Sequence, residues 1–137
     1  MTGLLVDTGF LIPLFRPTDS KRPHVRAFLQ SNRLPLITVA PVIVETCFFL
    51  DPQHKLALLE WVQRKALAVA DLPLCAYPAL STVIAKYADR DIDLADAALV
   101  WLAGETGVRT VLTVDQKDFG VYRLKGGKRF EVVRWFE

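Results

Sequence analysis

The sequence predicts an α/β fold, with one domain over residues 1–137 and a mostly parallel five-stranded sheet flanked by helices. Short apolar runs of strand length alternate with longer stretches in which apolar residues have helical spacing. Strands and helices that alternate along a chain form parallel βαβ units. A length of 137 residues and an apolar content of 52% suffice for one domain with a substantial core.

The first third of the chain predicts two strands and two helices. "GLLVD" is a short apolar run that ends in an acid, as expected for a buried parallel strand. "TGFLIPLF" then predicts a helix that Thr8 caps and that Pro13 kinks or ends early. Ser20 is the expected N-cap of a helix over residues 21–31, and "PLIT" is the second strand.

The middle of the chain predicts two more helices and a third strand. Pro41 suits a first helical turn, so "PVIVETCFFL" is expected to be a helix that carries Glu45 one turn in. Asp51 and Pro52 break this helix, and "HKLALLEWVQRKA" then has the spacing of an amphipathic one. "LAVADL" is the third strand. We expect three side chains of the amphipathic helix to face the core: Leu56, Leu59 and Val62.

The last third predicts two helices and two strands. Pro78 opens a helix over about residues 78–88. "DLADAALVWLAGETG" is a second helix, which ends near Gly104 or Gly107. "TVLTVD" is the fourth strand and "FEVVRWF" the fifth.

Composition limits the compartment and the cofactor. No apolar run approaches the roughly 20 residues that cross a bilayer. The N-terminus also lacks the basic region of a signal peptide, so we expect a cytoplasmic protein with no membrane contact. Cys47 and Cys75 lie in apolar surroundings and are expected to be buried free thiols. Zinc is not expected, because His24 and His54 are not spaced with these cysteines as zinc ligands.

Acidic residues occur where the predicted elements begin or end. Asp7 and Asp115 each follow an apolar strand, whereas Glu45 and Asp96 lie in the first turn or so of a helix. Sites in parallel α/β sheets form beyond the carboxyl ends of the strands. We therefore expect these four acids, from distant parts of the chain, to converge at that edge.

Capping offers a purely structural explanation for several of these acids. If Asp93 is an N-cap, Asp96 occupies the N3 position, where the helix dipole stabilises an anion by about 1 kcal/mol or less. Asp7 and Asp118 also stand where a cap is needed. Glu45 is different, because a fully buried, unpaired carboxylate would be very costly and must reach solvent, a base or a cation.

Crowded carboxylates repel one another, and a divalent metal removes that repulsion. A ligand set of oxygens alone selects Mg²⁺ or Mn²⁺ over zinc. Such an ion polarises a phosphate oxygen and lowers the pKa of a bound water, and two ions about 4 Å apart clamp both attacking and leaving oxygens. We hypothesise that the acids hold metal at a phosphodiester. The basic segments "RPTDSKRPHVR" and "YRLKGGKRFEVVRW" suit a polyanionic substrate.

Four motifs of the chain resemble, in order, the four acidic motifs of PIN-domain ribonucleases: "LLVDTGFLIPLF", "VIVETCFFL", "DLADAALVWLA" and "TVLTVDQKDF". The resemblance covers essentially the whole chain and is greatest to the small VapC-like toxins of prokaryotic toxin–antitoxin pairs. "YADRDIDLADAALVWLA" and "TVDQKDFGVY" are its most specific parts. It implies a parallel sheet flanked by helices and cleavage of single-stranded RNA with Mg²⁺ or Mn²⁺.

The resemblance also implies roles for individual residues. The metal-binding catalytic acids would be Asp7, Glu45, Asp96 and Asp115, with Asp7 and Asp96 the firmest ligands. Asp118 matches a more variable fifth acid, and Thr8 and Thr113 match small polar positions beside the first and last acids. Asp93 is additional relative to many members, so its role stays open.

Partners follow from the same resemblance. Members of this type usually form homodimers, and the toxins are neutralised by a small antitoxin whose tail enters the acidic groove. Four basic side chains are candidates for positioning the RNA backbone: Lys21, Arg22, Lys117 and Arg123. Tyr122 is a candidate for stacking on bases, with packing in the core as the alternative.

Two other classes of protein also have an aspartate at the end of the first strand. A haloacid-dehalogenase-like phosphatase needs Asp-x-Asp after its first strand, where this chain has Gly9 as the third residue. A response-regulator receiver needs an acid pair at that strand, and only Asp7 is present. The main alternative is an RNA-binding or interaction domain without nuclease activity, against which the presence of all four acids counts. A nuclease of ordinary RNA processing is the alternative to a toxin.

Overall fold

The sheet of the protein is entirely parallel, with strand order β3-β2-β1-β4-β5 in a computed structural model that describes residues 2–136. The strands are β1 (Leu4–Val6), β2 (Leu36–Val39), β3 (Ala68–Ala70), β4 (Thr110–Leu112) and β5 (Glu131–Val132). β1 lies at the centre and every residue in it is buried, as expected of an apolar strand covered on both faces. The predicted fold class is confirmed.

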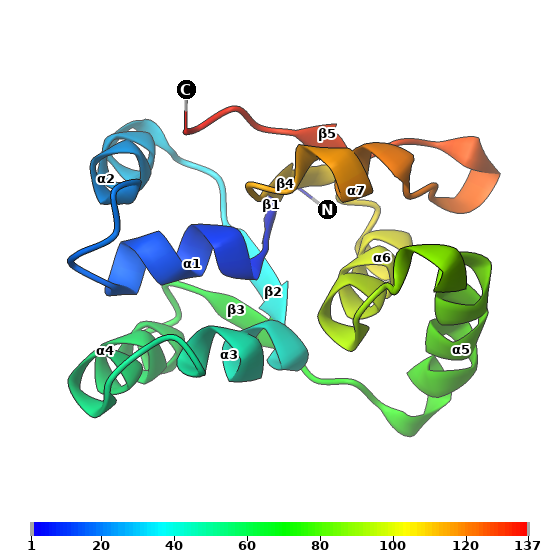
Figure 1. Cartoon of the computed structure of the whole chain (residues 1–137), viewed down its shortest axis with the longest axis horizontal. Coiled ribbons are helices and arrows are strands. Elements are labelled where there is room, and N and C mark those ends of the chain that lie inside the picture. The colour runs from blue at the N-terminus through cyan, green and yellow to red at the C-terminus, as the bar shows by residue number, and fades with distance from the viewer. Residues whose placement is uncertain (1, 137) are drawn as a thin grey trace.

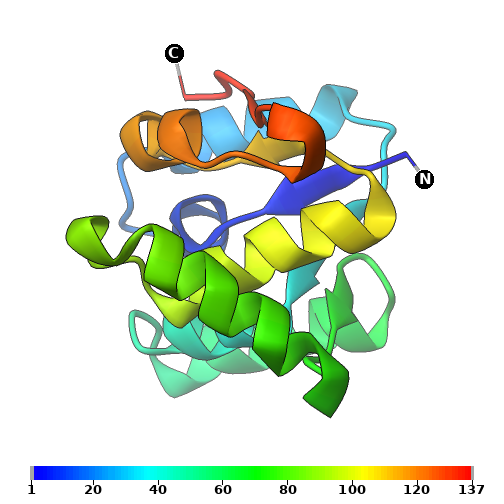
Figure 2. The same ribbon diagram turned by 90° about the vertical axis from the view of Figure 1, so that its right-hand side faces the viewer.

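Within residues 2–136, seven α-helices lie on the two faces and at the carboxyl edge of the sheet. They are α1 (Thr8–Phe15), α2 (Arg22–Ser31), α3 (Ala40–Cys47), α4 (Pro52–Gln63), α5 (Tyr77–Lys86), α6 (Leu94–Thr106) and α7 (Gln116–Val121). Figure 1 shows α1, α2 and α4 on one side of the sheet and α5 and α6 on the other, and Figure 2 shows α5 and α6 in front of it. No helix within residues 2–136 is long and apolar enough to cross a membrane.

The alanine-rich helix α6 contributes more buried residues than any other helix within residues 2–136. Its alanines and leucines pack between the sheet and α5, where small side chains permit a close approach. Asp93 begins the helix as its N-cap, accepting a hydrogen bond from the Asp96 amide at 2.8 Å. Gly107 ends it in the left-handed conformation, with φ of 75°. Both ends agree with the predicted helix.

The pairing of β1 with β4 places the first acid beside the fourth strand. Val6 is in register with Leu112, so the next residues along, Asp7 and Thr113, are neighbours at the carboxyl edge. The Asp7 amide continues the pairing by donating to the Leu112 carbonyl at 3.0 Å. Asp115 follows two residues after Thr113 and begins α7.

Two predicted helix starts are wrong by one or two residues. Thr8 is the first residue of α1 rather than its cap, and Asp7 precedes it in extended conformation. Pro13 does not end this helix, because the Arg16 amide still donates to the Ile12 carbonyl at 2.8 Å. α2 begins at Arg22 with Lys21 as its N-cap, rather than at residue 21 with Ser20 as its cap, and the turn before it is closed by the Asp19 carboxylate.

The predicted inner face of α4 is also wrong. The helix exposes two of the predicted core residues, Leu56 and Leu59. Leu58 is fully buried instead, Val62 is partly buried, and the Trp61 ring packs edge-on against Phe15 of α1 at 5.4 Å. Leu58, Trp61 and Val62 have helical spacing just as the predicted set does, and the aromatic contact with α1 selects between the two faces.

Two smaller expectations change as well. Cys75 is exposed, because the segment after β3 runs over the surface, while Cys47 is partly buried; both thiols are free. The fifth strand is only two residues long, because the chain after it turns so that Trp135 packs against Phe10 at 5.0 Å.

The orientation of α4 is testable by paired truncations. Leu58→Ala should lower the free energy of unfolding by about 2–5 kcal/mol, because it leaves a cavity in the core. Leu56→Ala should change it by less than about 0.5 kcal/mol, because 68% of that side chain is exposed. Urea denaturation measures both, and equal losses would contradict this packing.

Candidate active site

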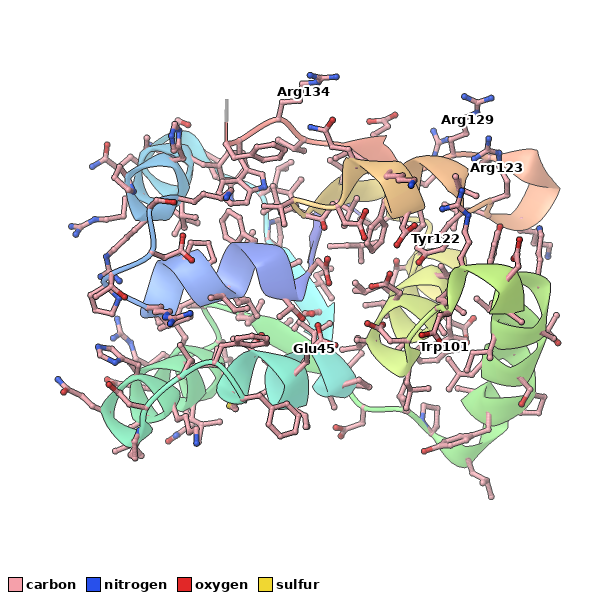
Figure 3. The ribbon with its side chains drawn as sticks, in the orientation of Figure 1. Glu45, Trp101, Tyr122, Arg123, Arg129 and Arg134 are labelled. Atoms are coloured by element: carbon pink, nitrogen blue, oxygen red, sulfur yellow. The ribbon has the colours of Figure 1, made fainter. Side chains whose placement is uncertain are left out.

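An acidic pocket of about 280 Å³ opens at the carboxyl edge of β1 and β4. Seven acidic residues line it: Asp7, Glu45, Asp91, Asp93, Asp96, Asp115 and Asp118. Among residues 2–136, no lysine or arginine lines it. Figure 3 shows Glu45, from α3, and Tyr122, after α7, on opposite sides of this region. The structure therefore brings together the four acids that the sequence singled out.

Asp7 is held by a hydroxyl relay from β4. The Thr113 hydroxyl donates to Oδ2 of Asp7 at 2.7 Å and accepts a hydrogen bond from the Asp115 amide at 3.0 Å. The amide fixes the hydroxyl as a donor toward Asp7. Burial raises the pKa of Asp7 to about 6, and the bond from Thr113 opposes that rise. A neutral hydroxyl, rather than a cationic side chain, therefore orients one carboxylate oxygen of Asp7.

Asp96 is held in the same way by a tyrosine. The Tyr122 hydroxyl donates to Oδ2 of Asp96 at 2.7 Å. Burial, followed by the negative charge of Asp7, raises the pKa of Asp96 to about 8. Burial and the bond to Asp96 raise the pKa of Tyr122 above its ordinary value, so its hydroxyl keeps the proton that it donates.

Asp115 and Asp118 form the third side of the pocket. Asp115 caps α7, accepting a hydrogen bond from the Asp118 amide at 2.9 Å, and burial raises its pKa. Asp118 is paired with Arg90, whose Nη1 lies 2.8 Å from Oδ1. The helix cap is therefore Asp115, whereas the sequence predicted a capping role for Asp118. Sequence reasoning did not find Arg90.

The donor atoms of the pocket fit a hard divalent cation. Asp96, Asp115 and Asp118 each offer a carboxylate oxygen, and these three atoms lie within 4.8 Å of one another. Asp7 and Glu45 line the same pocket but lie outside this group of three. Thr8 also lines the pocket, and its Oγ1 is buried with no hydrogen-bond partner among residues 2–136, which is rare for a hydroxyl unless a ligand satisfies it.

Of the two interpretations of Tyr122, stacking on bases and packing in the core, the structure shows packing in the core. Its ring is buried and packs against Tyr87 at 5.0 Å and Phe119 at 5.3 Å, while its hydroxyl is used on Asp96. The core alternative therefore holds for the ring. The hydroxyl has a role at the site that the sequence did not indicate.

The four predicted RNA-binding cations do not line the pocket. Arg22 donates to the Leu14 carbonyl near the far end of α1, and Lys21 precedes it. Arg123 donates from Nη1 to the carbonyls at the end of α7, beginning with Gly120 at 2.8 Å. Lys117 is exposed on α7. None of the four contacts the carboxylates in the part of the chain described.

A wider apolar groove of about 810 Å³ adjoins the acidic pocket. Its apolar lining comes from α3, α5, the start of α6 and the segments next to them: Ala40, Pro41, Val44, Phe48, Phe49, Leu72, Tyr77, Leu94 and Ala95. Phe48 is 81% exposed. Glu45, Phe49 and Asp93 line both hollows, so the two are continuous.

Comparison with known proteins identifies the family to which the chain belongs. Residues 4–124 match the PIN domain family. Over 134 residues the chain is 28% identical to ribonuclease VapC26 of Mycobacterium tuberculosis, covering 95% of this chain and 99% of that protein. The chain belongs to the PIN domain family, and the resemblance noted in its motifs is confirmed.

Two solved structures share the fold. The crystal structure of Mycobacterium tuberculosis VapC20, a sarcin-ricin loop cleaving toxin, matches 84% of this chain and 92% of its own, with a TM-score of 0.77 and 16% identity. A toxin–antitoxin complex from Klebsiella pneumoniae matches 98% and 99%, with a TM-score of 0.64 and 18% identity.

The raised pKa of Asp96 predicts that metal-free stability depends on pH. A carboxyl with a folded-state pKa near 8 binds its proton more tightly than the unfolded chain does, so its contribution to stability is lost as the pH rises through that value. In EDTA, Asp96→Asn should therefore gain in melting temperature over the wild type between pH 5 and pH 8.5, reaching about 3 °C or more. The asparagine oxygen still accepts the bond from Tyr122.

Thermal melts of the two proteins across this pH range measure the effect. Asp71→Asn, at an exposed acid outside the pocket, is the matched control and should track the wild type. A constant difference between Asp96→Asn and wild type at all pH values would show that burial and the neighbouring charges do not raise the pKa of Asp96.

Proposed function

We propose that this protein is a metal-dependent endoribonuclease that hydrolyses single-stranded RNA and acts in the cytoplasm as the toxin of a toxin–antitoxin pair. The observation that carries this proposal is a pocket of seven acids, lined by no lysine or arginine within residues 2–136, on a PIN domain fold. Such a pocket suits a divalent cation and, through it, a phosphate group. The matches to VapC proteins favour RNA as the substrate and a toxin as the role.

Mg²⁺ or Mn²⁺ is the proposed ion, and Asp96, Asp115 and Asp118 are the proposed first ligands, with Asp7 and Glu45 completing the set. Both are hard cations that prefer oxygen ligands. When bound, the ion supplies Lewis-acid polarisation of the phosphate and a lower pKa for a coordinated water.

The chain's own residues position the groups that react. Thr113 and Tyr122 each hold one oxygen of a carboxylate, so the second oxygen of Asp7 and of Asp96 stays available to the pocket. Glu45 lines the same pocket, and its proposed role is to accept a hydrogen bond from the attacking water. In the overall reaction a bond forms between phosphorus and the water oxygen, one ester P–O bond breaks, and the leaving alkoxide takes a proton.

Two protein partners belong to the proposal. A basic segment of an antitoxin suits the acidic pocket by charge, in line with the match to a toxin–antitoxin complex. A second copy of this chain is the proposed occupant of the apolar groove, because a continuous exposed apolar patch of this kind marks a protein interface. Phe48 is the most exposed of its lining residues.

Cleavage of a labelled single-stranded RNA tests the nuclease directly. The purified protein should cut with Mg²⁺ or Mn²⁺ and stop in EDTA, because the carboxylates act through a bound cation. Asp7→Asn should lower the rate by at least about a hundredfold, within the range seen when an electrostatic group of a catalytic site is removed. Gel analysis of the products measures the rate.

The control for cleavage is Asp71→Asn, which changes an exposed acid outside the pocket and should leave the rate unchanged. RNA binding that is unaffected by EDTA and is never followed by cleavage would contradict the nuclease and favour a binding domain. Growth arrest on expression of the wild type, and not of Asp7→Asn, would distinguish a toxin from an enzyme of ordinary RNA processing.

The dimer is tested by placing a charge in the apolar groove. Phe48→Glu should convert a dimer to a monomer in size-exclusion chromatography with light scattering, because a buried, unpaired carboxylate at an interface is costly. Leu56→Glu introduces the same charge at an exposed leucine of α4, outside the groove, and should leave the dimer intact. A monomeric wild-type protein would contradict this assembly.

A further inference from the structure

A basic loop joins α7 to β5 and consists of residues 123–129, "RLKGGKR". Four of its seven residues are cations and none is acidic: Arg123, Lys125, Lys128 and Arg129. An antiparallel bridge pairs Arg123 with Arg129, and the Leu124 amide donates to the Lys128 carbonyl at 2.8 Å. Figure 3 shows both arginine side chains at one corner of the molecule, above Tyr122.

This loop concentrates positive charge that no ion pair neutralises among the described residues. Like charges opposite each other in a bridged pair are destabilising, and the loop sets arginine against arginine. Within residues 2–136, no carboxylate forms an ion pair with Lys125, Lys128 or Arg129, and all three are exposed. Arg123 is the exception, because its Nη1 is used on the carbonyls that end α7.

The loop is firmly attached to the wall of the acidic pocket. The residue before it, Tyr122, donates to Asp96, and the Arg123 amide donates to the Tyr87 hydroxyl at 2.7 Å. The residue after it, Phe130, is buried against Phe119 with ring centroids 5.2 Å apart. Both ends are therefore anchored in one aromatic cluster that also orients a carboxylate of the site.

The turn of the loop depends on its two glycines. Gly126 and Gly127 have φ of 76° and 74°, in the left-handed region that other residues rarely adopt. Two consecutive glycines in this region reverse the chain within a few residues, which places Lys125 and Lys128 on either side of the turn. The positive charges are thus held together at one place on the surface.

We propose that the basic loop binds the sugar–phosphate backbone of the RNA substrate beside the acidic pocket, through Lys125, Lys128 and Arg129. This inference rests on the proposed function and locates the RNA on that same site. The pocket repels a polyanion, so a separate cationic surface must contribute the attraction that brings the strand to it. The other basic segment, around α2, lies on the opposite side of the sheet from α6 in Figure 1.

Binding of RNA without cleavage tests the loop. In an Asp96→Asn background, the triple variant K125Q/K128Q/R129Q should lose affinity for a fluorescent single-stranded RNA by about a hundredfold at 0.1 M salt. Each phosphate contact to a single strand contributes about 0.7 to the slope of log affinity against log salt, so the slope should fall by about 2. Fluorescence anisotropy at a series of salt concentrations measures both.

The matched control removes the same charge from the other basic segment. R16Q/R26Q/R33Q, at three exposed arginines in and around α2, should lower the affinity much less and leave most of the slope. Equal losses in the two triple variants, or an unchanged loop variant, would overturn the proposal. Retained RNA affinity together with lost binding to phosphatidylserine vesicles would overturn it in favour of a membrane surface.

Failure of this inference is distinguishable from failure of the nuclease. Metal-dependent cleavage by the wild type, with RNA affinity unchanged in the loop variant, would reject the loop and leave the nuclease standing. RNA binding that depends on the loop, in a wild-type protein that never cleaves, would support the loop and reject the nuclease. Unchanged melting temperatures of the triple variants confirm that both remain folded.

Discussion

Negative charge without matching positive charge is the constraint on which the rest of the acidic pocket depends. Within residues 2–136, Arg90 is the one cation paired with an acid of the pocket, and its partner is Asp118. The other oriented carboxylates are held by neutral donors, namely the Thr113 and Tyr122 hydroxyls and backbone amides. A neutral donor fixes an oxygen in place and leaves its charge intact. Burial, together with neighbouring negative charge, raises the pKa of Asp7 and of Asp96, so the pocket disfavours the charged form of both when no cation is bound.

The surrounding fold keeps these charges in place by making their backbone rigid. Thr113 links the first acid to the last. The strand register places it beside Asp7, and its hydroxyl accepts a hydrogen bond from the Asp115 amide. Its own carbonyl accepts a hydrogen bond from the Trp135 indole at 3.2 Å, and that ring packs on Phe10 of α1. The end of the chain thus supports the first and last acids at once. A pocket under repulsion needs such support, because its side chains gain nothing from staying close together.

The sequence was sufficient for features that depend on local structure and much less so for contacts between distant side chains. Asp7 and Asp115 are predictable, because an apolar run followed by an acid marks a strand end, and parallel strands bring their carboxyl ends to one edge. Asp93 follows from helix capping. Tyr122 and Arg90 are different, because each acts on a residue 26 or 28 positions away. An aromatic just after a short helix looks like any core residue until α7 is placed against α6.

The face of α4 illustrates a second limit, because two sets of apolar residues in that helix have equally good spacing. Only the Phe15–Trp61 contact decides between them, and it depends on where α1 lies. Thr8 shows that a local rule also fails when the surrounding fold decides the position of a side chain. A threonine after a strand is a natural helix cap by local rules. The strand instead leads through Asp7 directly into α1, and the hydroxyl is buried in the lining of the acidic pocket with no partner in the described part of the chain.

The net charge of +2 conceals a sharp separation of charge. Acids gather in the pocket, and unpaired cations gather on the loop that follows Tyr122. Two hydrogen bonds hold the loop next to the pocket. The Tyr122 hydroxyl donates to Asp96, and the Arg123 amide donates to the Tyr87 hydroxyl. A polyanion that approaches this surface is attracted by the loop and repelled by the pocket, so on the proposed function the pocket accepts a phosphate only together with a divalent cation. On the proposed function, the loop then attracts the RNA while the acids of the pocket are left to bind the metal.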